Sequence, residues 1–206
     1  MGKLQSLAKD TAIYGLSSIV GRFLNYLLVP LYTAKMSVES GNYGVVTNVY
    51  AWTAILLVLL TFGFETTFFR FASKEKGEVN KVFSMSLQVI GALCGVFLLL
   101  VFLFLPSIAN TLGYGMNPEF VGMMAVVVAL DALQSIPFGL LRLQNRPLKF
   151  ASLKLLNIFT NIALNLVVFL LLPWLNSIYP ELLGGVYNAS NQAFYVFFIN
   201  LVVHRS

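Results

Sequence analysis

Six long apolar stretches constrain the fold of this chain more than any other feature of its sequence. A helix rises about 1.5 Å per residue, so about 20 apolar residues span the hydrocarbon core of a bilayer. Turn-rich or charged segments separate the stretches, which cover residues 11–33, 45–64, 82–105, 120–141, 153–172 and 186–203. The sequence therefore predicts an all-α, polytopic membrane helix bundle with six transmembrane helices in a single lobe.

The composition agrees with a membrane protein and argues against several other classes. Of the 206 residues, 58% are hydrophobic and 10% are charged, against about 25% charged in an ordinary soluble domain. Cys94 is the single cysteine and His204 the single histidine, so the sequence offers neither a disulfide nor a zinc site. No nucleophile with a base partner is recognisable either. We expect no cofactor and no enzymatic activity.

The basic residues predict the orientation of the helices. The net charge of +5 would suggest nucleic acid in a soluble protein, but here the basic residues lie in the connections, where they orient membrane helices. We therefore expect no nucleic-acid partner. A cytoplasmic N-terminus leaves Lys35 outside and Arg22 within a stretch, and places eleven basic residues inside: Lys3, Lys9, Arg70, Lys74, Lys76, Lys81, Arg142, Arg146, Lys149, Lys154 and Arg205. This asymmetry predicts that both termini are cytoplasmic.

Arg22 lies near the middle of the first stretch, at bilayer depth. An arginine there costs about 3 kcal/mol on insertion scales, so it should face a polar partner or an aqueous cavity instead of lipid. Helical spacing places several polar residues on its face, among them Ser18, Asn25 and Tyr26. Two interpretations of Arg22 remain open: it lines a substrate cavity, or it belongs to a buried structural ion pair.

Asp131 is the acidic residue in the middle of the fourth stretch. It shares a helix face with Gln134, Ser135, Phe138 and Arg142. Asp131 could neutralise Arg22, or it could bind a proton or a cation, and the two interpretations are compatible if the pair opens during transport. Glu65 and Arg70 follow the second stretch, where they either line the mouth of a cavity or form an ordinary interfacial pair.

A polar stripe follows one face of the fifth stretch, formed by Lys154, Asn157, Asn161 and Asn165. One asparagine between membrane helices contributes on the order of 0.6 kcal/mol, so three in line indicate a hydrophilic path more than simple interhelical adhesion. The first turns of the sixth stretch are also polar and include Gln192. We predict that these side chains line the same cavity as Arg22.

Taken in order, several segments of the chain resemble the polysaccharide-export flippases. The first half contributes IYGLSSIVGRFLNYLLVPLYT, then NYG, GFETTFFRF and the basic loop KEKGEVNK. The second half contributes IPFGLLRLQNRPLKFASLKLLNIFTNIALN and GGVYNASNQAFYVFFINLVV. These flippases form one superfamily with the lipid II flippases and the multidrug and toxin extrusion proteins.

The resemblance implies a function, a location and partners. It implies flipping of an undecaprenyl-pyrophosphate-linked oligosaccharide across the bacterial inner membrane, by alternating access between two six-helix lobes with coupling to an ion. By position, Arg22 would face the pyrophosphate, with Arg70 and Arg142 nearer the cytoplasmic mouth. This chain supplies one lobe only, so the expected partners are membrane lipid, the lipid-linked oligosaccharide, and a missing second lobe or a second copy. The alternatives are a lobe of a cation-coupled multidrug or toxin antiporter, and a non-transporting scaffold in polysaccharide assembly.

Overall fold

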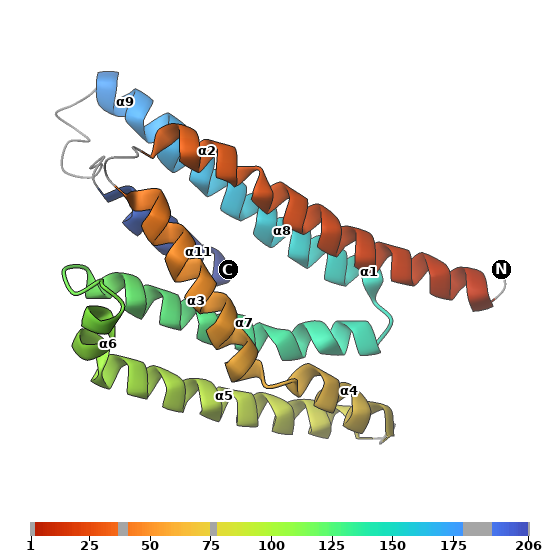
Figure 1. Cartoon of the computed structure of the whole chain (residues 1–206). Helices are drawn as coiled ribbons and strands as arrows, with labels where there is room; N and C mark the ends of the chain where they lie inside the picture. The colour runs from red at the N-terminus through yellow and green to blue at the C-terminus, as the bar shows by residue number, and fades with distance from the viewer. Residues whose placement is uncertain (1–2, 37–40, 75–77, 179–190, 206) are drawn as a thin grey trace.

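The computed structural model describes residues 3–36, 41–74, 78–178 and 191–205, and within these ranges all regular secondary structure is helical (Figure 1). The all-α prediction is confirmed for these ranges. In chain order the helices are α1 (Lys3–Tyr26), α2 (Leu28–Lys35), α3 (Asn42–Thr61), α4 (Phe64–Lys74), α5 (Val79–Leu103), α6 (Leu105–Thr111), α7 (Pro118–Leu143), α8 (Pro147–Leu166), the π-helical η1 (Val167–Leu171), α9 (Leu172–Ile178) and α11 (Gln192–Arg205).

Five helical segments are long and apolar enough to cross a membrane. They are Thr11–Lys35, Asn42–Lys74, Val79–Leu103, Pro118–Leu143 and Pro147–Ile178, and they correspond to the first five predicted stretches. The sixth stretch begins outside the described residues, and its described part is the shorter apolar helix Gln192–Val203. The chain is a multi-pass membrane protein, while the count of six spans and the cytoplasmic location of both termini stay predictions.

Two of these spans are interrupted by changes in the backbone. Pro30 has no N–H to donate to the carbonyl of Tyr26, and the first span breaks at Leu27, between α1 and α2. The second span breaks at Phe62 and Gly63, which both adopt left-handed backbone angles, with φ values of 43° and 69°. Each interrupted span therefore has two helical pieces, α1 with α2 and α3 with α4.

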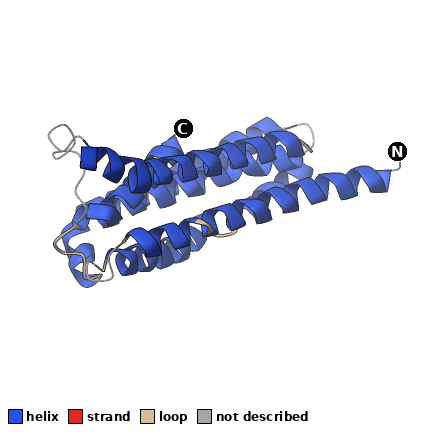
Figure 2. Cartoon of the chain, turned by 90° about the horizontal axis from the view of Figure 1, so that it is seen from above, coloured by secondary structure: helices blue, strands red, loops and turns tan. Residues whose placement is uncertain are grey.

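The helices form two groups with a wedge between them (Figure 1). In one group α1 packs along α8, and α2 and α9 continue these two helices. In the other group α7 packs against α4, α5 and α6. The groups diverge towards the left of Figure 1, where α3 and α11 lie between them. The view from above shows the long helices running alongside one another as a bundle (Figure 2).

The packed core lies mainly in this wedge. Its residues come from α2, α3, α7, η1 and α11 and include Tyr32, Val46, Phe169 and Phe197. Phe68 centres a smaller cluster that joins α4, α5 and α7. Lipid tails are as apolar as leucine, so inside a bilayer these contacts stabilise the bundle by close packing.

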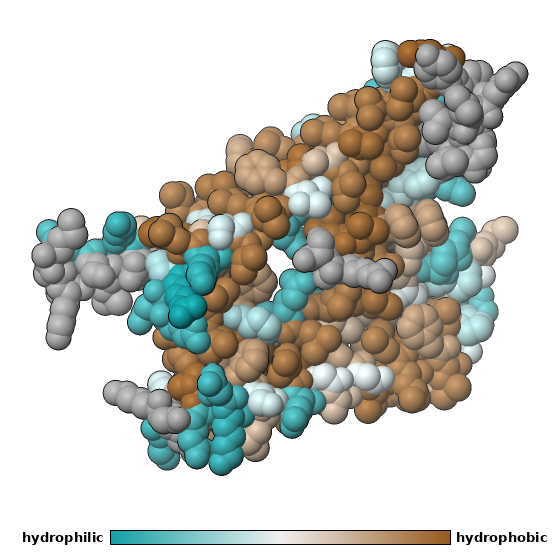
Figure 3. Space-filling view, turned by 180° about the vertical axis from the view of Figure 1, so that it is seen from behind, coloured by the Kyte–Doolittle hydropathy of each residue, from teal (hydrophilic) through white to brown (hydrophobic). Residues whose placement is uncertain are grey.

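The face seen in Figure 3 is predominantly hydrophobic, as expected of a protein surrounded by lipid. Hydrophilic residues gather at the left of this view, the end that carries the N-terminus, and at its right edge. They also appear in the hollow between the two hydrophobic masses. Large exposed apolar side chains include Leu16, Phe23, Val58 and Leu99.

Candidate functional site

A polar cavity of about 450 Å³ lies between α1, α4, α7, α8 and α11. The structure brings together nine of the side chains that sequence analysis predicted for a site, which are Ser18, Arg22, Asn25, Glu65, Asp131, Arg142, Lys154, Asn157 and Asn161. They come from segments up to 143 positions apart, from Ser18 to Asn161.

Helical spacing explains why these side chains converge. On α1, residues 18, 22 and 25 recur every three or four positions and share one face, and residues 154, 157 and 161 do the same on α8. The two helices approach closely at Gly21, where an added Cβ would lie 2.5 Å from Cδ1 of Ile158. Asp131 and Arg142 belong to the polar face of α7, which closes the cavity from the other side.

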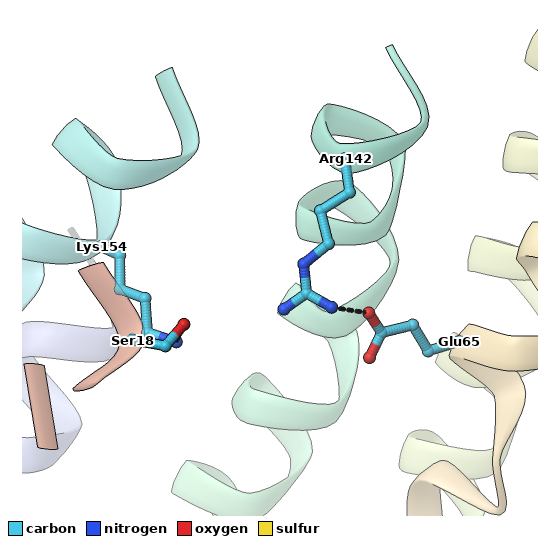
Figure 4. A network of polar contacts seen from close by, with 4 residues as sticks. All are labelled: Ser18, Glu65, Arg142 and Lys154. Atoms are coloured by element: carbon cyan, nitrogen blue, oxygen red, sulfur yellow. Dashed lines mark hydrogen bonds and ion pairs between the residues drawn. The ribbon is translucent and has the colours of Figure 1, made fainter. Parts of the chain in front are cut away.

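The charged residues of the cavity are three basic and two acidic, namely Arg22, Arg142, Lys154, Glu65 and Asp131. Arg142 forms an ion pair with Glu65, and both side chains are 38% exposed (Figure 4). Glu65 lies in the first turn of α4 and Arg142 in the last turn of α7, the helix ends at which the backbone dipole favours each charge. The cavity therefore has a net positive charge. The Glu65–Arg142 pair also holds α4 against α7.

The ring of Phe150 contacts two of the three basic residues of the cavity. The guanidinium carbon of Arg142 lies 4.9 Å from the centre of its ring, and Nζ of Lys154 lies 5.5 Å from it, both within the range of cation–π attraction. The ring is buried and packs edge-on against Tyr14 and Phe138. Phe150 thus contacts both cations from a fixed position.

Lys154 on α8 and Arg142 on α7 both line the cavity, and their polar ends have different partners (Figure 4). Lys154 donates a hydrogen bond of 3.5 Å to the hydroxyl of Ser18 on α1. Arg142 is turned towards Glu65 on α4 (Figure 4). The two pairs therefore form two walls of one polar space.

A chain of amides leads from the cavity into the core. Nδ2 of Asn161 donates to Oδ1 of Asn25 at 3.4 Å, and Nδ2 of Asn165 donates to the backbone carbonyl of Asn161 at 2.8 Å. The Tyr32 hydroxyl completes the chain by donating to Oδ1 of Asn165 at 2.7 Å. Asn165 is fully buried. It therefore links α8 to α2.

The structure places four other predicted site residues outside this cavity. Tyr26 is 68% exposed on the surface of α1, and Arg70 is exposed on α4. Asn165 is buried against Tyr32, and Gln192 is buried with Nε2 donating to the Lys35 carbonyl at 3.1 Å. Gln192 thus ties the start of α11 to the end of α2. Contact of any of these residues with substrate stays a prediction.

Phe150 and Asn200 are two of the lining residues that sequence analysis did not single out. Asn200 is buried on α11, where its Nδ2 donates to the hydroxyl of Tyr50 and to the carbonyl of Val196 at 2.8 Å. A signal for Asn200 existed, because it follows Gln192 by eight residues and so shares its helix face. No comparable signal marked Phe150, one of 18 phenylalanines in an apolar chain.

The cavity is suited to an anionic, hydrogen-bonding ligand more than to a metal ion. Arginine matches phosphate oxygens with its planar fork of donors, and lysine adds a mobile point charge. Within residues 3–36, 41–74, 78–178 and 191–205, no group of three or more His, Cys, Asp or Glu side chains could hold a metal ion. The arrangement can bind a phosphate group and present amides to whatever the phosphate carries.

Comparison with known proteins gives one result over nearly the whole chain. The sequence model of the family described as "Polysaccharide biosynthesis protein" matches residues 7–205. No curated protein and no solved structure matches the chain.

Proposed function

Because the chain belongs to the polysaccharide biosynthesis protein family, we propose that it is a transporter lobe that flips an undecaprenyl-pyrophosphate-linked oligosaccharide during polysaccharide export. The membrane would be the bacterial inner membrane. The long apolar helices of the chain and its family support the view that it is a membrane protein of polysaccharide export. The lipid-linked substrate and the flipping step are the parts that we propose.

The observation that carries this proposal is the cluster of three basic side chains in a cavity between membrane helices. Charged groups at membrane depth are costly and mark ion or substrate paths. A pyrophosphate is multiply negative, so Arg22, Arg142 and Lys154 would replace the water that it loses on leaving the headgroup region. The neighbouring amides would then accept and donate hydrogen bonds to the rest of the ligand.

We further propose alternating access with a second lobe, supplied by a second copy of the chain or by another polypeptide segment. Arg22 lines the cavity and yet is exposed in the single chain. Leaving an arginine in contact with lipid is costly, so a partner surface should cover it. The face that carries Arg22 and Asn161 is where this partner would dock.

Substitution of Arg22 tests the proposed function. We expect Arg22→Ala to abolish polysaccharide export in cells that depend on this protein, and Arg22→Lys to retain part of it. Lysine keeps the charge and loses the forked geometry. The matched control is Arg146→Ala, because Arg146 is an exposed arginine outside the cavity. Normal export by a well-expressed Arg22→Ala variant would refute an anion-binding cavity.

One observation favours a second candidate function, a lobe of a cation-coupled multidrug or toxin antiporter. Asp131 lines the same cavity, and an intramembrane carboxylate is suited to proton or cation binding. In that case Asp131→Asn would abolish cation-driven drug efflux, whereas Arg22→Ala would leave it intact. A protein with neither activity, in which both variants behave as wild type, would instead be a scaffold.

A further inference from the structure

A second cavity, of about 260 Å³, adjoins the first at its far end. Its walls come from α1, α2, α3, α8 and α11, and the lining residues that it shares with the first cavity are Asn25, Asn161 and Asn200. The two cavities therefore meet at three asparagines. This second space includes none of the charged residues that line the first.

The chemistry of the second cavity differs from that of the first. None of its lining residues is Asp, Glu, Lys, Arg or His. Its polar groups are the hydroxyls of Tyr32, Tyr43, Tyr50 and Thr47 and the three shared amides, beside aliphatic side chains such as Leu28 and Val46. Neutral hydroxyls and amides next to aromatic rings suit an uncharged polyol, whereas an ion would find no opposite charge there.

We infer that this second cavity binds the first sugar ring of the ligand, while the first cavity holds the pyrophosphate. The inference rests on the proposed function and adds a neutral subsite to it. A pyranose presents hydroxyls at its edge and C–H groups on its faces. The edge can exchange hydrogen bonds with amides and phenols, and a C–H face can pack on a tyrosine ring.

The order of the two cavities along the bundle agrees with the order of groups in such a ligand. The first sugar is bonded directly to the pyrophosphate, so the two subsites must be contiguous, and the shared asparagines make them so. Arg142 is in the last turn of α7, next to the α7–α8 connection, and pairs with Glu65. Helix α2 and the start of α3 lie at the opposite end of the bundle (Figure 1). The sugar would point away from the basic end.

Two tyrosines of the subsite are held in place by the bundle. Tyr32 donates to Asn165 at 2.7 Å, and Tyr50 accepts a hydrogen bond from Asn200. Tyr43 and Thr47 line the second cavity and not the first. The Thr47 hydroxyl donates to the carbonyls of Tyr43 and Gly44, both at 3.0 Å, which leaves its oxygen as an acceptor. These two residues of α3 therefore allow the sugar subsite to be changed alone.

The test compares two probes on the purified full chain, polyprenyl pyrophosphate and the same lipid carrying one hexose. For wild type we expect the hexose to tighten binding about tenfold, equivalent to about 1.4 kcal/mol. Tyr43→Leu and Thr47→Val should each remove most of this gain and leave binding of the bare pyrophosphate unchanged. Tyr195→Leu is the matched control, because Tyr195 is a half-buried tyrosine outside both cavities, and it should keep the gain.

Each other outcome overturns a defined part of the argument. Equal binding of both probes by wild type would overturn the sugar subsite and leave the anion site standing. Binding of neither probe would overturn the proposed function, and the subsite with it. If Tyr43→Leu weakens both probes equally, or unfolds the protein, Thr47→Val decides, and an undiminished hexose gain in that variant would also overturn the subsite.

Discussion

Arg142 and Lys154 contact the same aromatic ring, but their other partners differ in strength. Arg142 is committed to an ion pair with Glu65, whereas Lys154 has only a long hydrogen bond to Ser18. A flexible ammonium with one weak partner can turn towards an arriving phosphate at little cost, while the guanidinium must first leave a carboxylate. Lys154 is therefore expected to make the first contact with an anion.

Asn165 is a structural residue whose loss should destabilise the bundle. Its Oδ1 accepts from Tyr32 and its Nδ2 donates to Asn161 inside the core. Asn165→Leu leaves the buried Tyr32 hydroxyl without this partner, and we expect the free energy of unfolding to fall by about 1–3 kcal/mol. Denaturant unfolding in detergent would measure it.

The double variant Tyr32→Phe/Asn165→Leu supplies the control. It removes both polar groups, so its loss of stability should be smaller than the sum of the two single losses. Additive losses would show that the Tyr32–Asn165 hydrogen bond contributes nothing.

Helical periodicity predicted those cavity residues whose placement depends on one helix alone. Ser18, Arg22 and Asn25 share a face of α1 in any environment, as Asn157 and Asn161 do on α8. Asn165 continues the same face, but there the neighbouring helix is α2 and the side chain is buried. The contacts of Phe150 depend on how α7, α8 and α1 approach one another, which no local pattern records.

The break between α3 and α4 positions Glu65 and depends on two left-handed residues. Gly63 has φ of +69° and open space where a Cβ would lie. Gly63→Ala should therefore cost about 1 kcal/mol through backbone strain alone. Gly95 also has open space around its Cβ position but lies inside α5, so Gly95→Ala should be neutral or stabilising. Thermal unfolding of the two variants distinguishes strain from packing, and equal shifts would exclude strain at Gly63.

Helix bounds were predicted less well than helix positions, for a physical reason. An apolar stretch marks what lies in hydrocarbon, whereas a helix begins where its hydrogen bonds begin. α1 starts at Lys3, eight residues before the first apolar stretch. Pro30 and Gly63 lie at or near the ends of predicted stretches and yet divide spans into two helices.

The orientation of the whole bundle can be tested with single cysteines. Met116→Cys and Ser177→Cys should react with an impermeant thiol reagent from outside, whereas Lys74→Cys and Gln144→Cys should not. All four positions are exposed. The native Cys94 is buried and donates to the Ala129 carbonyl, so it should give little background. Reversed labelling would refute the orientation that the basic residues predict.

The net positive charge of the cavity couples the proposed cycle to the membrane potential. Each charge that crosses 100 mV gains or loses about 2.3 kcal/mol. The empty cavity has one excess positive charge, so a negative cytoplasm favours the conformation in which the cavity opens inwards. Bound pyrophosphate makes the cavity negative, and the same voltage then favours the conformation that opens outwards. An inside-negative voltage thus favours both the loaded and the returning half of the cycle. We expect transport in proteoliposomes to accelerate under such a voltage. Lys154→Gln leaves the empty cavity neutral and makes the loaded cavity more negative, so the voltage should then act on the loaded half of the cycle and no longer on the returning half.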